Sequence, residues 1–394
     1  MERLLLETAA LLDPEARAPR AGALLLAGGR IEARLEPGAS PPPDTRLVQL
    51  PGLSLAPGFL DVHYHGALIF TPPSSAATAL AAAGRALLAN GVTGFLPTTV
   101  TWPAAELEAH VSAWAEAAAA LASPAAAAAV IGLHLEGPWI RPEAAGAQPK
   151  AGIRPFRRED AGLLDRAAGL VRLVTLAPET EGADALLAAL AQRGVVAALG
   201  HSLADAATCE RAVANGARHV THLFNAMGAF HQREPGLIGV ALADDRLSCD
   251  LICDGVHVHP AVVRTAARAK GDQLVLITDN VAIPAHSKNA SAFSFGAGAV
   301  HDDGTALRLA DGTLAGSRLT LDRALANVEA FGALDRLGAV RAVTLAPARL
   351  LGIERERGSL RPGARADFTM LDADGAVAET WLAGHCVYRR GDRP

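Results

Sequence analysis

Short apolar runs that alternate with alanine- and leucine-rich stretches dominate the middle of this sequence. Apolar runs of this length are typical of strands buried on both faces of a parallel sheet, and the stretches between them suit helices. The runs span residues 58–63, 92–98, 130–136, 171–177, 195–201, 219–222, 248–253 and 274–279. Eight βα units in series are what a (β/α)8 barrel requires, so the sequence predicts an α/β fold with a TIM-like barrel.

Both ends of the chain differ from this middle. Residues 1–56 and 342–394 contain short apolar stretches interrupted by turns rich in glycine and proline, which favours strands over helices. We therefore expect a small β-sandwich domain built from both chain ends. Its N-terminal part is residues 1–56 and its C-terminal part is residues 342–394, which leaves residues 57–341 for the barrel.

Composition and charge narrow the class of protein. The 394 residues carry a formal net charge of −5, and the pI near 6.2 gives no basic surface for a nucleic-acid backbone. No apolar run reaches the roughly 18 residues of a membrane span, and the N-terminus lacks the pattern of a secretory signal. We therefore expect no nucleic acid, no membrane and a cytoplasmic location. The four cysteines are widely spread, which does not indicate a disulfide framework.

Residue types that bind metals stand where the apolar runs end. They are His63 and His65, Glu136, His201, His222 and Asp279, at the ends of the first, third, fifth, sixth and eighth runs. Because the carboxyl ends of barrel strands converge on one face, these side chains can meet around one point. Imidazole and carboxylate together suit zinc, ferrous iron, manganese or cobalt. The sequence therefore predicts a divalent metal site at this face.

Each of these residues also has a simpler interpretation. A His-x-His pair recurs by chance, Glu136 could form a structural salt bridge, and Asp279 could be a helix N-cap. His201 and His222 could be hydrogen-bonded core histidines. Their joint occurrence at the same end of successive strands favours the metal site over a set of independent accidents.

Several longer segments carry a family resemblance. In chain order they are PGFLDVHYHG, GVTGFLPTT, GLHLEGPW, LGHS, THLFNAM, REPG, DGVH, TDN and LAGSRLTLDRAL. Together with the closing segments TLAPARLLGI and RGSLRPGARADFTMLD, this series resembles the N-acetylglucosamine-6-phosphate deacetylase family of the amidohydrolase superfamily. The resemblance implies hydrolysis of the acetamide of a phosphorylated amino sugar to glucosamine 6-phosphate and acetate, and a homodimer.

The resemblance also implies roles for the residues at the strand ends. Glu136, His201 and His222 would hold the principal metal ion, and Asp279 would be the catalytic acid and base. His63 and His65 are retained, which permits a second ion bridged by Glu136. We expect one or two ions per chain, with Zn²⁺ or Fe²⁺ the foremost candidates.

A further set of residues is implied to bind substrate. It consists of Gln148, Asn225, Ala226, Arg233 and His257, with Arg233 at the phosphate and Gln148 near the acetyl carbonyl. Without the resemblance, a surface salt bridge of Arg233 with Glu234 is the simpler interpretation. Two features depart from the family pattern: residues 67–70 are apolar where a glycine-rich run is common, and Gln148 stands where a histidine is usual.

Other functions stay open at this point. A related amidohydrolase could act on another N-acyl amino sugar, an N-acyl amino acid or a cyclic amide, because barrel and metals serve many substrates. A catalytically inactive scaffold is a second alternative, which the complete set of predicted metal ligands disfavours.

Overall fold

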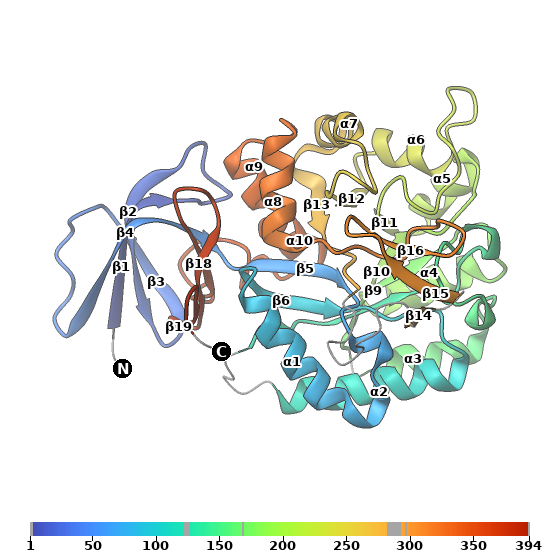
Figure 1. Ribbon diagram of the computed structural model, residues 1–394, viewed down its shortest axis with the longest axis horizontal. Helices are drawn as coiled ribbons and strands as arrows, with labels where there is room; N and C mark the ends of the chain where they lie inside the picture. Colours follow the sequence, from blue (N-terminus) through green and yellow to red (C-terminus); the bar gives the residue numbers. More distant parts are fainter. Residues whose placement is uncertain (1–2, 122–126, 168, 282–292, 296–297, 393–394) are drawn as a thin grey trace.

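The structure is a computed structural model that describes residues 3–121, 127–167, 169–281, 293–295 and 298–392. A curled parallel sheet flanked by helices occupies the right of Figure 1, and a smaller mixed sheet lies at the left. Both chain ends lie at the smaller sheet. None of the described helices combines the length and the hydropathy needed to cross a membrane.

All eight predicted runs form parallel strands, in chain order. They are β5 (Phe59–Tyr64), β6 (Val92–Pro97), β7 (Ala129–Val130) with β8 (Leu133–Glu136), β9 (Val171–Leu176), β10 (Val196–Leu199), β11 (Ala217–Val220), β12 (Ser248–Ile252) and β13 (Leu274–Ile277). The third run is divided because its first part pairs with β6 and its second part pairs with β9. Strands β5, β6, β8 and β13 are buried along their whole length, as strands covered on both faces should be.

Hydrogen bonds arrange these strands in two parallel sheets. One has the order β13-β12-β11-β10-β9-β8 and the other the order β5-β6-β7. Single parallel bridges, between Tyr64 and Asn280 and between Thr98 and His134, connect β5 to the end of β13 and β6 to β8. The strand ends that carry the predicted metal ligands therefore face the same side of the molecule.

Helices follow the strands and bury their apolar faces against them. They are α1 (Ala76–Leu88), α2 (Ala104–Ala120), α3 (Ala161–Arg166), α4 (Ala183–Gln192), α5 (Ala206–Ala214), α6 (Gly236–Ala243), α7 (Pro260–Lys270), α8 (Leu321–Ala330), α9 (Arg336–Val343) and α10 (Leu345–Leu350). In α1, Leu80, Gly84, Leu87 and Leu88 are buried, and their spacing of three to four residues places them on one face.

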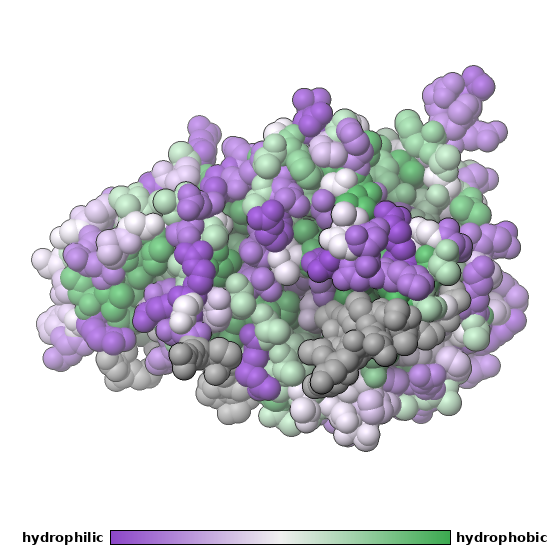
Figure 2. Space-filling view, viewed as in Figure 1, coloured by the Kyte–Doolittle hydropathy of each residue, from purple (hydrophilic) through white to green (hydrophobic). Residues whose placement is uncertain are grey.

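The two chain ends join in one seven-stranded mixed sheet. Its strands are β1 (Arg3–Leu11), β2 (Arg20–Ala27), β3 (Arg30–Leu35), β4 (Thr45–Pro57), β17 (Phe368–Leu371), β18 (Val377–Leu382) and β19 (His385–Arg389), in the order β19-β18-β17-β4-β1-β2-β3. Successive residues of β1 alternate between two hydrophobic clusters, with Leu4 and Leu6 in one and Leu5 in the other. Hydrophobic side chains also gather over this sheet at the left of Figure 2.

Strand β4 connects this sheet to the parallel one. It pairs with β1 on one side and with β17 on the other, and β5 begins two residues after β4 ends. Gly58 lies between β4 and β5, where an added Cβ would come within 2.2 Å of the Thr93 side chain. The nitrogen of Gly58 donates to the carbonyl of Asp367, at 2.9 Å.

A fourth sheet contributes to the cavity lining at the carboxyl ends of the parallel strands. Its antiparallel strands are β14 (Phe293–Phe295), β15 (Gly298–Asp302) and β16 (Leu307–Leu309). The turn after β16 is closed by a hydrogen bond from the nitrogen of Leu309 to the carbonyl of Thr313. In Figure 1 the strands β15 and β16 are seen in front of β9 and β10.

Two buried threonines of the small sheet donate hydrogen bonds to the end of α1 and to the turn after it. Thr369 donates to the carbonyl of Gly91 at 2.6 Å, and Thr380 donates to the carbonyl of Leu88 at 2.7 Å. We expect Thr369→Val and Thr380→Val each to lower the free energy of unfolding by about 1 kcal/mol, because each removes a buried hydrogen bond without changing volume. Denaturant unfolding measures this loss.

The exposed Thr265 of α7 provides the matched control, since its hydroxyl donates to the carbonyl of Ala261 at 3.1 Å. Thr265→Val should leave stability nearly unchanged. Equal losses in the buried and exposed variants would show that these hydroxyls do not fasten the sheet.

Candidate active site

The six predicted metal-site residues meet at the carboxyl ends of the parallel strands. His63, His65, Glu136, His201, His222 and Asp279 are at most 9% exposed. Two groups, each of three residues, could hold a metal ion: Glu136 with His201 and His222, and Asp279 with His63 and His65. The structure thus brings together every residue of the predicted metal site.

Three of these six residues have a backbone in the left-handed region. His201, His222 and Asp279 have φ values of 47°, 34° and 47°, which cost L-residues on the order of 1–3 kcal/mol each. Hydrogen bonds hold the turns: the nitrogen of Asp279 donates to the carbonyl of His63 at 3.0 Å, and the nitrogen of His222 donates to the Asp250 carboxylate. Each of the three lies two residues beyond the end of its strand, so the left-handed conformation breaks the extended backbone at that point.

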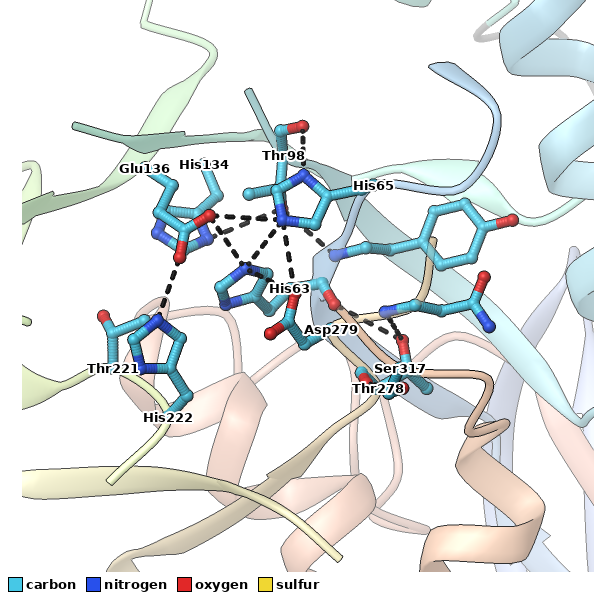
Figure 3. A network of polar contacts seen from close by, with 12 residues as sticks. His63, His65, Thr98, His134, Glu136, Thr221, His222, Thr278, Asp279 and Ser317 are labelled. Atoms are coloured by element: carbon cyan, nitrogen blue, oxygen red, sulfur yellow. Dashed lines mark hydrogen bonds and ion pairs between the residues drawn. The ribbon is translucent and has the colours of Figure 1, made fainter. Parts of the chain in front are cut away.

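The carboxylate of Glu136 lies between the two groups of ligands (Figure 3). Its Oε1 is 3.0 Å from Nε2 of both His201 and His222. Its Oε2 is 3.5 Å from Nε2 of His63 and 3.2 Å from Nε2 of His65. One oxygen therefore faces each group, which is the arrangement that a bridging carboxylate requires.

The spacing and chemistry of these atoms suit a divalent metal ion. Ligand atoms of a tetrahedral zinc site lie about 3.3 Å apart, given metal–ligand distances of about 2.0 Å. Nδ1 of His201 donates to the carbonyl of Ala144 at 2.8 Å, and Nδ1 of His65 donates to the carbonyl of Thr98 at 3.1 Å. Because a carbonyl only accepts, these bonds place a proton on each Nδ1 and direct each Nε2 into the site, where a metal ion would bind.

Burial and charge act in opposite directions on the pKa values of the site. Burial raises the pKa of Glu136, but the charge of His63 and the hydrogen bonds of His201 and His222 outweigh it and hold that pKa well below its usual range. Burial likewise raises the pKa of Asp279, but His63 and His65 lower it by more, so the pKa of Asp279 is below its usual value. Both carboxyl groups are therefore ionised at neutral pH. For His65, burial lowers the pKa, but hydrogen bonds to Asp279 and Glu136 raise it to about 10.

The site forms the floor of a cavity of about 570 Å³. Four of the five residues implied to bind substrate line it: Gln148, Asn225, Ala226 and His257. Nδ1 of His257 lies 2.6 Å from the Asp254 carboxylate, which fixes the ring and leaves Nε2 for a ligand. The amide nitrogen of Gln148 donates to Glu136 Oε2 at 2.5 Å.

The fifth residue, Arg233, lies outside the cavity lining. It is on an exposed loop, residues 229–234, in which Phe230 is 58% exposed. Residues 67–70, which depart from the family pattern, are also absent from the lining; Leu68 and Ile69 are buried in the main hydrophobic core. The apolar run at 67–70 thus packs inward instead of forming a wall of the cavity.

Other lining residues were not identified from the sequence. They include Glu143, Leu203, Phe224, Met227, Val281, Arg308 and Leu314. Phe224 and Met227 belong to the THLFNAM segment and Leu314 is the first residue of LAGSRLTLDRAL, so these motifs could have pointed to them. Nothing in the local sequence distinguishes Arg308 from a solvated arginine.

A sequence profile of the amidohydrolase family matches residues 54–387. The chain belongs to the amidohydrolase family. Among its relatives is the N-acetylglucosamine-6-phosphate deacetylase of Bos taurus, 39% identical over 351 residues that cover 86% of this chain and 84% of the relative. The enzyme of the same name from Bacillus subtilis (strain 168) is 36% identical over 352 residues, 88% of each chain.

This amidohydrolase also resembles a solved structure over nearly its whole length. The structure is a mutant of the N-acetyl-D-glucosamine-6-phosphate deacetylase from Mycobacterium smegmatis in complex with N-acetyl-D-glucosamine-6-phosphate. The TM-score is 0.87 at 33% sequence identity, and the match covers 98% of this chain and 100% of the other. The resemblance indicated by the sequence motifs is therefore confirmed.

The hydrogen bonds of Gln148 generate a prediction about metal binding. Its Oε1 accepts from the nitrogen of Thr101 at 3.0 Å, which orients the amide nitrogen toward Glu136. We expect Gln148→Leu to weaken metal binding roughly 10- to 100-fold, because partners of ligand side chains have effects of that size. Competition with a chelator measures the affinity.

Gln273→Leu is the control for this change. The amide of Gln273 donates to the carbonyl of Asp245 at 2.6 Å, on the exposed surface. If Gln148→Leu binds metal as tightly as the Gln273→Leu variant, the bond to Glu136 has no part in holding the ion.

Proposed function

We propose that this amidohydrolase hydrolyses the acetamide of N-acetylglucosamine 6-phosphate, with glucosamine 6-phosphate and acetate as products. The observation that carries the proposal is the position of Glu136 and Asp279, two buried carboxylates among four histidines on the floor of a cavity of about 570 Å³. Relatives that are 36–39% identical over most of the chain bear the name of this activity. An assay of acetate release from N-acetylglucosamine 6-phosphate tests it.

The ligands for the metal would come from this chain. Glu136, His201 and His222 would hold the principal ion, and His63 and His65 a second ion that shares Glu136. A bound divalent ion lowers the pKa of a water molecule to about 7 and polarises the amide carbonyl. The identity of the ion, Zn²⁺ or Fe²⁺, and the number of ions stay predictions.

Asp279 moves the proton in this scheme. Its lowered pKa keeps it a carboxylate at neutral pH, so it can accept the proton of the attacking water at a carboxylate oxygen. It then returns that proton to the amide nitrogen as the C–N bond breaks, which releases the amine. Two backbone hydrogen bonds fix the position of Asp279. Its nitrogen donates to the carbonyl of His63, and its carbonyl accepts from the nitrogen of Ser317 at 2.8 Å.

The sugar would lie between Asn225, Ala226 and His257. Asn225 is held by weak hydrogen bonds from its amide to the carbonyls of His222 and Leu223, at 3.3 and 3.4 Å. This connects the sugar subsite directly to a metal ligand. The nitrogen of His257 and its ring both bond to Asp254, so its position does not depend on substrate.

Arg233 remains our prediction for a phosphate contact. Because it lies outside the cavity lining of its own chain, it can reach a bound phosphate only from a second copy or after movement of its loop. The homodimer that the resemblance implies would supply the second copy.

Finer features of the fold and setting also stay predictions. We infer that the two parallel sheets close into one (β/α)8 barrel, supported by the bridge between Tyr64 and Asn280, and that the mixed sheet curls into a small sandwich. The division into residues 1–56, 57–341 and 342–394, the homodimer and the cytoplasmic location are further expectations.

Two substitutions separate proton transfer from metal binding. We expect Asp279→Asn to keep bound metal and lose roughly 10²- to 10⁴-fold in turnover, the usual contribution of a general acid–base group. Glu136→Ala should lose the metal, because it removes the carboxylate of the principal ligand group, which also faces His63 and His65. Metal analysis and the acetate assay together measure both effects.

Glu143→Ala is the control, since this exposed carboxylate lines the same cavity and belongs to neither ligand group. Full metal content in Glu136→Ala, or metal loss in Asp279→Asn, would contradict the assigned roles.

Arg233 is tested by comparing phosphorylated and free substrate. We expect Arg233→Ala to lower the ratio of kcat/KM for N-acetylglucosamine 6-phosphate to that for N-acetylglucosamine at least about tenfold, because an arginine fork binds a dianion strongly. The association state of the variant is measured alongside. An unchanged ratio in a variant that still associates would make Arg233 a surface residue.

A further inference from the structure

A second cavity, of about 650 Å³, lies between the small sheet and the parallel strands. One side is formed by Leu382 of β18 and by His385 and Val387 of β19, and the other side by residues of α1, α2 and β7 (Figure 1). None of its described lining residues also lines the cavity at the strand ends. The two cavities are therefore separate sites.

Most of the wall of this second cavity is aliphatic. The aliphatic lining includes Leu80, Ala81, Ala118, Ala128, Ala129, Val130, Ile131, Leu382 and Val387. Such a wall favours the apolar part of a ligand, because burial there removes apolar surface from water.

The charge of the lining has one sign. Among its described residues are three arginines and neither an aspartate nor a glutamate. Arg85, in the last turn of α1, has no hydrogen-bond or ion-pair partner in the described part of the chain. The cavity thus holds an excess of positive charge, although the formal net charge of the whole chain is −5.

Asp367 holds the other two arginines in place. Its Oδ2 accepts from Nη1 of Arg357 at 2.6 Å and from Nε of Arg365 at 2.9 Å. Because one oxygen binds both, the two guanidinium groups lie close together, and one carboxylate offsets only one of their two charges. Nη2 of each arginine makes no hydrogen bond to a described residue, so donors remain for a ligand.

A buried hydroxyl lies at the same place. Ser359 is 3% exposed, and its Oγ has no hydrogen-bond partner within the described residues. It borders a small recess together with Thr93, Arg357 and Arg365, which also line the cavity. Buried polar groups are normally paired, and burial also lowers the pKa of Arg357. An oxyanion at this recess would satisfy the hydroxyl and offset the burial of the charge.

We propose that this cavity binds a small organic anion, with an oxyanion head at Arg357 and Arg365 and an apolar body along the aliphatic wall. The head is a carboxylate or a phosphate, because an arginine fork binds either. Arg85 contributes further positive charge. The bound anion contacts both the small sheet and the helices beside the parallel strands, so it stabilises the folded chain.

Calorimetric titration of the wild-type protein tests this with octanoate, octyl phosphate, 1-octanol and inorganic phosphate. We expect at least one of the two octyl anions to bind about tenfold or more tightly than 1-octanol, which lacks the charge, and than inorganic phosphate, which lacks the apolar body. The anion that binds more tightly identifies the head group. It should also raise Tm, because it binds the folded chain only.

Two variants locate the site. We expect Arg85→Ala to weaken binding of that anion at least about fivefold and Arg365→Gln at least about tenfold, because each removes a charged donor. Arg268→Ala is the matched control. Like Arg85, Arg268 is an exposed arginine in the last turn of its helix, but it does not line the cavity. Its affinity should equal that of wild type, and thermal unfolding verifies that each variant is folded.

Three results would overturn the proposal. Neither octyl anion binds to wild type; or Arg85→Ala and Arg365→Gln bind as tightly as Arg268→Ala, so that the arginines only hold the small sheet in place; or inorganic phosphate binds as tightly as octyl phosphate and octanoate, so that the aliphatic wall has no part in binding. None of these measurements involves acetate release, so failure of the proposed function would leave them unchanged.

Discussion

The contact of one buried carboxylate with two groups of histidines is the constraint on which the rest of this structure depends. Glu136 is 2% exposed, and its two oxygens face different groups. A carboxylate buried without compensating partners would be strongly unfavourable, so the surrounding strands must deliver imidazoles to within about 3 Å of it. The common edge of the parallel strands brings residues as distant as 63 and 222 to one point.

Placing the ligands costs backbone energy that packing elsewhere must offset. His201, His222 and Asp279 adopt left-handed backbone, and each turn is fixed by the neighbouring strand or by a buried side chain such as Asp250. Asp250 is in turn 3.0 Å from the His219 ring. The rigidity of the metal site therefore comes from buried polar groups between the strands as well as from the apolar core.

Sequence patterns predicted the strands and the ligand set because both are periodic or type-specific. Apolar runs mark buried strands, and His63, His65 and Glu136 stand out as polar residues at the ends of such runs. Three features had no such signal. The division of the third strand depends on which neighbour each half pairs with; the bond from Gln148 to Glu136 depends on a loop conformation; and Arg308 reaches the cavity through a sheet that is remote in sequence.

The central position of β4 in the small sheet bears on how the chain is made. Its partner β17 follows all the strands of the parallel sheets in the chain, and Phe368 of β17 pairs with Pro57 of β4. During synthesis at about 5–20 residues per second, one edge of β4 must therefore wait roughly tens of seconds for the strand that covers it. An uncovered edge is open to pairing with other chains. Strands β17, β18 and β19, which follow the parallel strands in the chain, thus complete a sheet that β1 to β4 began.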